Sequence, residues 1–254
     1  MTPWYERWNI KHLSPSSINA WRDNPASFVV GWCFGMWSDE AMPAAWRGKA
    51  CEGALNAFLH GAPKEEALQR AVDLFELEAK GVAEDDVQKQ RDLLPRMCER
   101  AFIAAEEIGL TRPTASQLRL ECFLENFEVP IIGYPDFIFD EHCLDLKSTE
   151  RCPSEKPNAM HAMQVSLYAH ARGESEAKLL YVSHTKYNLF TLNSEEISKN
   201  MRDLERLARS IRATLSRAYT KEELAEMCAP DFSHYRWSDE KLVSRVQSEI
   251  QAWS

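Results

Sequence analysis

The spacing of apolar residues predicts a helical first part of the chain. From Trp46 to Leu59 the apolar residues recur at the interval of an amphipathic helix, and Gly61 is suited to end that helix. Ser14 followed by Pro15 is a typical helix start, with the hydroxyl as N-cap and the proline at the first helical position. Helices are therefore expected at about 14–24, 44–61, 63–80 and 84–108.

After residue 116 the pattern changes to alternation of β-branched and aromatic residues, which is typical of strands. The pattern predicts antiparallel strands at about 117–127, 130–140 and 143–148, a helix at 155–172, and two strands within 178–192. Helices are then expected near 194–218, 220–228 and 238–252. This order indicates an α/β fold, in which a central mixed sheet has helices on both faces.

The length favours one domain over residues 1–254. Within it we expect a helical N-terminal part, a sheet core that carries the chemistry, and C-terminal helices, at 1–115, 116–193 and 194–254.

Charged residues interrupt the second and third strands of this core. Residues i and i+2 of a strand point to the same side, so Asp145 and Lys147 share a face while Leu146 points to the other. If a turn near 140–142 joins two antiparallel strands, Asp136 lies close to Asp145. The sequence therefore predicts two carboxylates and an ammonium group at one spot.

Two interpretations of these charges are open from the residues alone. An exposed salt bridge between Asp145 and Lys147 is the simpler one. The flanking residues are apolar, however, and a half-buried pair of carboxylates is costly without a cation. Mg²⁺ or Mn²⁺ is the natural partner because hard cations prefer oxygen ligands.

The same residues resemble the signature of the PD-(D/E)XK nuclease superfamily. Pro135-Asp136 and Asp145-Leu146-Lys147 are similar to its paired motifs. Three further stretches resemble elements of its RecB-like and lambda-exonuclease-like members, in the same order over residues 13–172: LSPSSINAWRDNP the N-terminal helix, Gly48 and Glu52 the GxxxH or GxxxE motif, and Gln164 and Tyr168 the QxxxY motif. RecB-type members commonly have His at the position of Glu52, whereas lambda-exonuclease types tend to have an acid.

The resemblance implies a restriction-endonuclease-like core and a role for each motif residue. Asp136, Asp145 and the Leu146 carbonyl would bind the metal, with Glu52 as a third carboxylate. Lys147 would position or activate the attacking water. Gln164 and Tyr168, which are i and i+4 on one helix face, would hydrogen-bond a phosphate, a base or Lys147.

The implied activity is that of an Mg²⁺- or Mn²⁺-dependent deoxyribonuclease. We expect an exonuclease that leaves 5′-phosphates and acts in DNA recombination, repair or phage DNA processing. A catalytically inactive nucleic-acid-binding subunit with the same fold is the alternative. A metal-dependent hydrolase of another phosphoester is a third, weaker one.

The cysteines bear on the choice of cofactor. The chain has seven, without a CxxC pair, and only Cys228 follows Tyr168. The iron–sulfur members of the superfamily need four thiolates, so no iron–sulfur cluster is expected. Free thiols also fit a reducing compartment. With no run of about 18 apolar residues and no signal peptide at the start, we expect a cytoplasmic protein without a membrane span.

The net charge of −9 argues against nucleic-acid binding through bulk charge. Residues 199–221 are different, with seven Lys or Arg and two Asp or Glu, a net charge of +5. On a helix there, Arg202, Arg206 and Arg209 form a stripe that could follow a DNA backbone, or be an ordinary solvated face. DNA is the expected partner, with a second copy of the chain or a recombination protein as further candidates.

Overall fold

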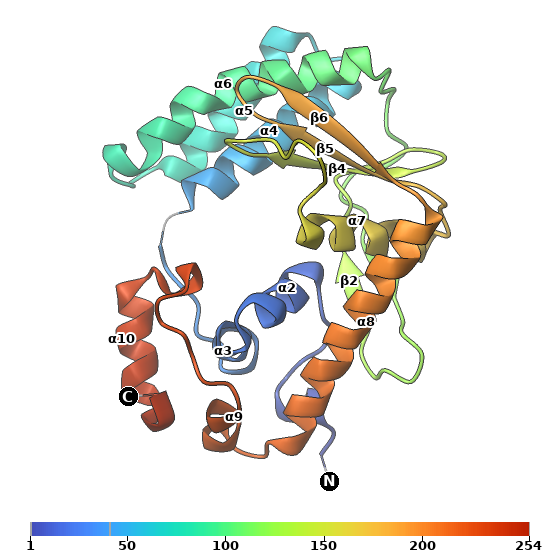
Figure 1. The fold of residues 1–254 in the computed structure, drawn as a ribbon. Helices are drawn as coiled ribbons and strands as arrows, with labels where there is room; N and C mark the ends of the chain where they lie inside the picture. The colour runs from blue at the N-terminus through green and yellow to red at the C-terminus, as the bar shows by residue number, and fades with distance from the viewer. Residues whose placement is uncertain (1, 41, 254) are drawn as a thin grey trace. The chain divides into compact units, whose positions relative to one another are not determined.

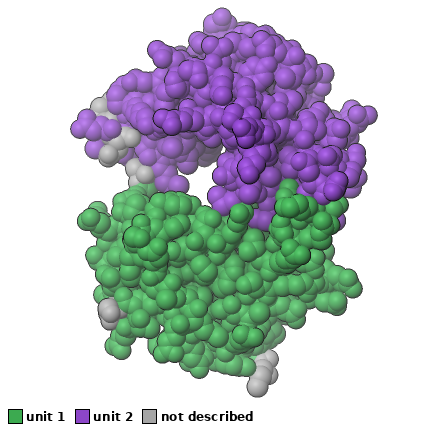
Figure 2. Space-filling view, in the orientation of Figure 1, with its two compact units in different colours: residues 1–40, 121–133, 198–254 green, residues 41–120, 134–197 purple. Residues whose placement is uncertain are grey.

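The computed structural model describes residues 2–40 and 42–253, which divide into two compact units. Figure 2 colours unit 1, from residues 1–40, 121–133 and 198–254, and unit 2, from residues 41–120 and 134–197. Every candidate site residue named above except the three arginines belongs to unit 2. The expectation of a single domain stays a prediction. None of the helices among the described residues combines the length and the apolar composition needed to cross a membrane.

Unit 1 is mainly helical. Its first well-capped helix, α2, has Pro15 at its first turn and a capping box between Ser14 and Ser17, as the sequence predicts. Trp4, Trp8 and Trp21 are buried in this unit, so these three tryptophans serve its core. The elements are α1 (Trp4–Arg7), α2 (Pro15–Asp23), α3 (Pro25–Phe28), the π-helical turn η1 (Val29–Cys33), α9 (Lys221–Met227), η2 (Tyr235–Trp237), α10 (Glu240–Glu249) and η3 (Gln251–Trp253).

Helix α8 (Ser194–Arg217) begins in unit 2 and continues through unit 1. Its apolar face is buried as the sequence pattern predicts, through residues Ile197, Met201, Leu204, Ile211 and Leu215. A two-stranded sheet joins β1 (Leu120–Cys122) and β2 (Ile131–Gly133).

Unit 2 is built on a four-stranded sheet in the order β3-β4-β5-β6. Strands β4 and β5 are parallel, and the other two pairs are antiparallel, so the sheet is mixed as expected. The strands are β3 (Phe137–Ile138), β4 (Cys143–Ser148), β5 (Ala177–Val182) and β6 (Tyr187–Leu192). The parallel step from β4 to β5 passes through helix α7 (Ala159–Arg172), as a parallel crossover requires.

Helices cover both faces of this sheet (Figure 1). One face packs on α4 (Pro43–Leu59) and α6 (Glu84–Glu107), against which α5 (Lys64–Ala79) packs in turn, and α7 packs against the other face. Leu144 and Leu146 of β4 belong to the same buried cluster as Phe75 and Phe102 of the helices. Alternation along β4 therefore turns Asp145 and Lys147 toward α7.

Two predicted strands differ from the structure. The expected strand at 130–140 is interrupted, and its halves β2 and β3 belong to different sheets. Pro135 lies in the interruption and has no N–H to donate to a ladder. The expected strand at 117–127 is reduced to Leu120–Cys122, and Asn126 after it has a left-handed backbone with φ of 54°. In both cases, alternation alone predicted a longer strand than the structure has.

Candidate active site

The β3–β4 hairpin brings Asp136 and Asp145 together. Phe137 pairs with Leu144 in the antiparallel register, so one further step places Asp136 opposite Asp145. The Leu146 N–H donates to Asp136 Oδ2 at 2.8 Å and holds this carboxylate against β4. Asp136 is 8% exposed and Asp145 is 0% exposed. The structure thus brings the two acids together in an apolar setting, as strand alternation predicts.

Lys147 lies on the same face of β4 as Asp145. Its Nζ is 2.6 Å from Asp145 Oδ2. That oxygen is nevertheless buried without a hydrogen bond of good geometry from any described residue, so the contact is a close ion pair and not an aligned hydrogen bond. Burial alone would lower the pKa of Lys147, but the carboxylates of Asp145 and Asp136 raise it above its usual value. Lys147 is therefore a fixed, permanent cation.

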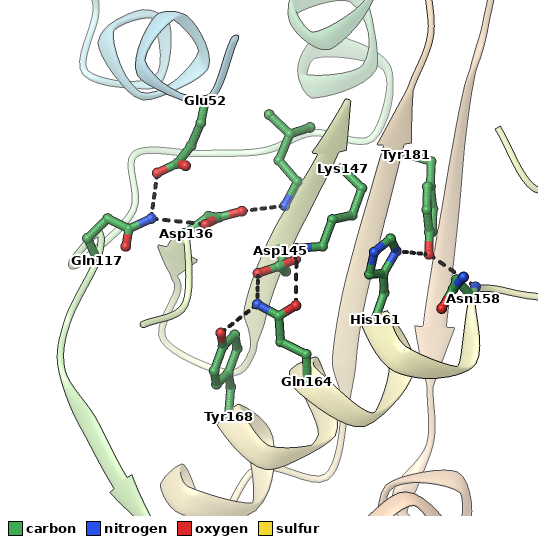
Figure 3. A network of polar contacts seen from close by, with 11 residues as sticks. Glu52, Gln117, Asp136, Asp145, Lys147, Asn158, His161, Gln164, Tyr168 and Tyr181 are labelled. Carbon is green, nitrogen blue, oxygen red and sulfur yellow. Dashed lines mark hydrogen bonds and ion pairs between the residues drawn. The ribbon is translucent and has the colours of Figure 1, made fainter. Parts of the chain in front are cut away.

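Helix α4 supplies a third carboxylate. Gly48 lies where this helix passes the end of β4, and a Cβ atom there would contact Ser148 Oγ at 3.4 Å. Glu52 follows one helical turn later on the same face. Its Oε1 accepts a hydrogen bond from Gln117 Nε2 at 2.6 Å, and the same nitrogen donates to Asp136 Oδ1 at 3.0 Å. We refer to Glu52, Asp136 and Asp145 as the carboxylate cluster (Figure 3).

Gln117 is a site residue that sequence reasoning missed. Its backbone has a φ of 52°, in the left-handed region that non-glycine residues rarely adopt, and its N–H donates to the Pro135 carbonyl at 3.0 Å. Strain of this kind is typical of functional sites. No periodic pattern marks the residue, because it lies in an irregular segment that alternation predicted to be a strand.

Burial, and then repulsion between the acids, raises the pKa of Asp136 and of Glu52. Burial, then the charges of Asp145 and Glu52, raise the pKa of Asp136 well above its usual value, against the smaller opposing effects of Lys147 and the Leu146 N–H. Burial and Asp145 likewise raise the pKa of Glu52, while the Gln117 hydrogen bond opposes the rise. One lysine does not balance three acids that lie so close together.

Helix α7 presents Gln164 and Tyr168 to this cluster, as the sequence predicts. Gln164 Oε1 accepts from Lys147 Nζ at 3.2 Å, and Gln164 Nε2 donates to the Tyr168 hydroxyl at 2.7 Å. The same nitrogen is 3.5 Å from Asp145 Oδ1, at the limit of a hydrogen bond. Burial and then Asp145 raise the pKa of Tyr168, which keeps this phenol protonated. The side chains converge in Figure 3.

Beside Lys147 lies a second polar chain, to which the sequence assigned no function. His161 Nδ1 is 2.8 Å from the Tyr181 hydroxyl, which also accepts from the Asn158 backbone N–H at 3.1 Å. Tyr181 is opposite Lys147 in the parallel register of β4 and β5. Burial, together with Lys147, lowers the pKa of His161 to about 4, so this imidazole is neutral at physiological pH.

The three arginines of the basic stripe lie on α8, within unit 1. Arg206 pairs with Asp203 at 3.1 Å, and Arg209 with Glu205 at 2.6 Å. Arg209 also donates to the Glu125 carbonyl at 2.9 Å. Arg202 is exposed. Neighbours on the helix thus offset part of the charge, and contact with a DNA backbone stays a prediction.

Among the described residues, no three His, Cys, Asp or Glu side chains are arranged to hold a metal ion. The hydrogen bonds explain this arrangement, because Gln117 and the Leu146 N–H occupy oxygens of Glu52 and Asp136, and Lys147 sits on Asp145. The donor set still fits a hard divalent cation. It is made only of oxygens, its acids repel one another, and Asp145 Oδ2 is buried without a hydrogen bond.

Comparison with known proteins agrees with the motifs. The model of the PD-(D/E)XK nuclease superfamily matches residues 12–237. A solved structure of a proposed exonuclease from Eubacterium rectale is similar in fold, with a TM-score of 0.55 and 13% identity over 86% of each chain. The alkaline exonuclease of Laribacter hongkongensis matches with a TM-score of 0.29 and 11% identity, over 66% of this chain and 96% of its own. No curated protein matches the sequence.

Proposed function

The chain belongs to the PD-(D/E)XK nuclease superfamily, and we propose that it is a DNA exonuclease that hydrolyses phosphodiester bonds with Mg²⁺ or Mn²⁺. One observation carries the proposal. Asp136, Asp145 and Glu52 converge from a hairpin and a helix on one spot, where Lys147 is the adjoining cation. An inactive binding protein has no need of this costly set of partly buried charges.

The residues that would hold the metal are the carboxylate cluster and the Leu146 carbonyl. A bound divalent ion supplies Lewis-acid activation of the phosphate and of a water molecule. Gln117 already draws Glu52 and Asp136 toward one nitrogen, which keeps the two carboxylates close in the metal-free protein. Metal binding requires that the Gln117 amide lose at least one of its two hydrogen bonds to the carboxylates.

Lys147 is the residue that we assign to the reacting phosphate. Asp145 and Gln164 hold its ammonium group from two sides, so its position is fixed before substrate arrives. A preorganised cation stabilises negative charge that develops on the phosphate oxygens in the transition state. Tyr168 acts through Gln164, because it anchors the amide that contacts Lys147. Gln164 and Tyr168 are therefore positioning residues.

The proposed place of this activity is DNA recombination, repair or phage DNA processing, as the family resemblance implies. The exonuclease assignment draws on the resemblance to lambda-exonuclease-like members, and the α4 carboxylate Glu52 is consistent with it. The products would carry 5′-phosphates.

A cleavage assay tests the proposal. Linear duplex DNA, single-stranded DNA, closed circular plasmid and RNA are incubated with the protein in Mg²⁺, in Mn²⁺ and in EDTA. We expect metal-dependent release of mononucleotides or short products from linear DNA only. Asp145→Asn should abolish it, whereas Lys156→Ala, an exposed charge change in the same unit, should not. Metal-independent cleavage, or full activity of Asp145→Asn, would refute the assignment; cutting of closed circles would replace exonuclease by endonuclease.

A further inference from the structure

A cavity of about 570 Å³ lies in unit 2 between the loop that follows β4 and the turn that joins β5 to β6. Part of α6 closes one side. Its polar lining includes two hydroxyl side chains and six further residues, which are Lys89, Glu150, Arg151, Ser183, His184 and Lys186. We refer to it as the hairpin cavity. None of the six belongs to the motifs or to the carboxylate cluster.

The charge of the hairpin cavity is opposite in sign to that of the whole chain. Three of its side chains are cations and one is a carboxylate, which leaves two positive charges in a protein of net charge −9. Glu150 is already neutralised by Lys89, whose Nζ lies 2.6 Å from its Oε1. Arg151 and Lys186 make no ion pair with any described residue. Two cations are thus free to meet an anion.

Hydrogen bonds link the two segments that form the walls of the cavity. The Thr149 N–H donates to the Val182 carbonyl at 2.8 Å, and Cys152 Sγ donates to the Lys186 carbonyl at 3.4 Å. Asn188 Nδ2 also donates to the Pro153 carbonyl. The loop after β4 is therefore fixed to the β5–β6 hairpin, so the cations are carried on an ordered frame. Such preorganisation lowers the entropic cost of binding.

One buried polar atom of the lining residues lacks a hydrogen-bond partner among the described residues. His184 Nδ1 is buried and forms no hydrogen bond with any described residue. Ser183, next to it, is 1% exposed and uses its hydroxyl within the turn, where it accepts from the Lys186 N–H at 3.1 Å. The two unpaired cations favour an anion as the occupant, and the His184 tautomer that carries its proton on Nδ1 would donate to an oxygen of that anion.

The cavity follows directly on the catalytic strand. Glu150 is three residues after Lys147, so their Cα atoms are separated by about 11 Å at most. Arg47, which is buried on α4, donates to the Ser148 carbonyl at 3.1 Å. The hydrogen bond from Lys89, with a smaller effect of the Arg47 charge, lowers the pKa of Glu150. A nucleic-acid strand carries one phosphate per about 3.4 Å of duplex axis, and its phosphates are further apart than this because the backbone winds round the axis, so a phosphate next to the reacting one is within this reach.

We propose that the hairpin cavity binds a non-reacting phosphate of the nucleic-acid strand and thereby sets the register of that strand on the carboxylate cluster. The proposal rests on the function proposed above. The ligand class is a phosphate group, held by Arg151 and Lys186 with Lys89 shared between it and Glu150. Contacts to a backbone phosphate carry no sequence information, so the site would position any sequence equally.

Binding of a fluorescent DNA oligonucleotide in EDTA, over a series of salt concentrations, tests the cavity without hydrolysis. Arg151→Ala with Lys186→Ala should weaken binding by about tenfold or more and reduce the slope of log Kd against log salt by roughly 0.7–0.9 for each phosphate that is no longer neutralised. Glu150→Gln should do the opposite, because it frees Lys89, and we expect tighter binding by about threefold.

Matched controls remove the same charges outside the cavity. Arg96→Ala with Lys156→Ala, and separately Glu155→Gln, alter exposed side chains that do not line it. Both should stay within about twofold of the unchanged protein. Equal effects of the two double variants would refute the proposal, since bulk charge would then suffice. Weaker binding by Glu150→Gln would also refute it. Thermal melts verify that every variant is folded.

Two further arms separate the alternatives. Inorganic phosphate, titrated in thermal melts, tests whether the cavity takes a free anion; if it stabilises the protein while the cavity variants bind DNA normally, the nucleic-acid assignment is wrong. The cleavage assay in Mg²⁺ is independent of both. Loss of DNA affinity in the cavity variants without any nuclease activity in the unchanged protein would support the cavity and refute the proposed function. Nuclease activity of the unchanged protein, together with normal DNA binding by the cavity variants, would support the proposed function and refute the cavity.

Discussion

The carboxylate cluster of unit 2 and the basic stripe of α8 differ in how their charges are balanced. On α8, each of Arg206 and Arg209 has an acidic neighbour within one helical turn, and Arg206 is 76% exposed in its side chain. In the cluster, three acids share one lysine, and the Asp145 side chain is 1% exposed. Water screens the charges on α8 more strongly than those of the carboxylate cluster. Similar charged residues therefore contribute differently to the free energy of the protein in the two regions.

This difference indicates which charged residues of the sequence have a function. Exposed pairs contribute about 0–1 kcal/mol each and are replaceable. Charges that are held together with little screening by water repel one another, and such strain persists at sites where a ligand or a reaction relieves it. The comparison is sharpened by changing one residue of each region and measuring the same properties.

The largest expected contrast is in catalysis. Lys147→Ala should reduce the rate of DNA cleavage by about 10²–10³-fold, because a fixed cation next to the reacting phosphate is removed. Arg206→Ala on α8 should leave the rate at saturating DNA unchanged. Single-turnover cleavage of linear DNA in Mg²⁺ measures both. Near-normal cleavage by Lys147→Ala would show that its pair with Asp145 is only structural.

The second contrast is in the response to metal. Mn²⁺ at about 100 times its Kd should stabilise the unchanged protein by about 2.7 kcal/mol through linkage. For a chain of this size that is roughly 5–10 °C in Tm. Asp136→Asn removes one repelling charge at nearly constant volume, so it should leave the metal-free protein as stable or more stable and abolish most of the shift.

Thermal melts with and without Mn²⁺ measure this second contrast, and Arg206→Ala serves as the control that keeps the full shift. A simple salt bridge would give the opposite result, in which Asp136→Asn destabilises slightly and Mn²⁺ changes nothing. If the unchanged protein shows no shift at saturating Mn²⁺, the carboxylate cluster is not a metal site.

The features of the site also differ in how well the sequence predicted them. The meeting of Asp136 with Asp145 followed from strand alternation and an antiparallel hairpin, which are local rules. Gln164 and Tyr168 were found through the resemblance to the QxxxY motif, and helical spacing places both on one face. Gln117 was not found, because its left-handed backbone and its bridge to two carboxylates depend on residues distant in sequence. Charge counting found the basic stripe, and helical spacing of three and four residues also predicts the pairs of Arg206 with Asp203 and of Arg209 with Glu205.

The fold was predictable to a similar depth. The mixed sheet and its flanking helices were expected, and α8 lies within one residue of the predicted range. The strand expected at 130–140 was wrong because Pro135 separates β2 from β3. The hairpin cavity was not anticipated, since its lining comes from α6, a loop and a turn that only the sheet topology brings together.

A third contrast lies in the dependence of stability on pH. The pKa of Asp136 is raised in the folded, metal-free protein, so above its usual value of 3.8 the folded state holds a proton that the unfolded state releases. Stability from this group is therefore greatest at low pH and is lost as pH rises through the folded pKa. The free energy of unfolding of the unchanged protein, minus that of Asp136→Asn, should fall as pH rises from about 4 toward neutrality.

Urea titrations in EDTA at several pH values measure this difference, which cancels the contribution of the other acids. Asp203→Asn on α8 is the matched control. It removes a carboxylate whose side chain is 43% exposed, where water screens the surrounding charges, so the Asp136 difference should change more with pH. A rising difference for Asp136 would mean that Lys147, and not the neighbouring carboxylates, dominates its environment.

The smallest expected effects are those of the basic stripe on stability. Arg206→Ala should change the free energy of unfolding by less than about 0.5 kcal/mol, since its pair with Asp203 is exposed and screened. If the stripe follows a DNA backbone, joint replacement of Arg202, Arg206 and Arg209 by alanine should still weaken binding for all sequences alike. The salt slope should then fall by about 0.7–0.9 for each phosphate that an arginine no longer neutralises. Anisotropy in EDTA measures it, and an unchanged slope would leave α8 as a solvated face whose charges, unlike those of the cluster, have no ligand.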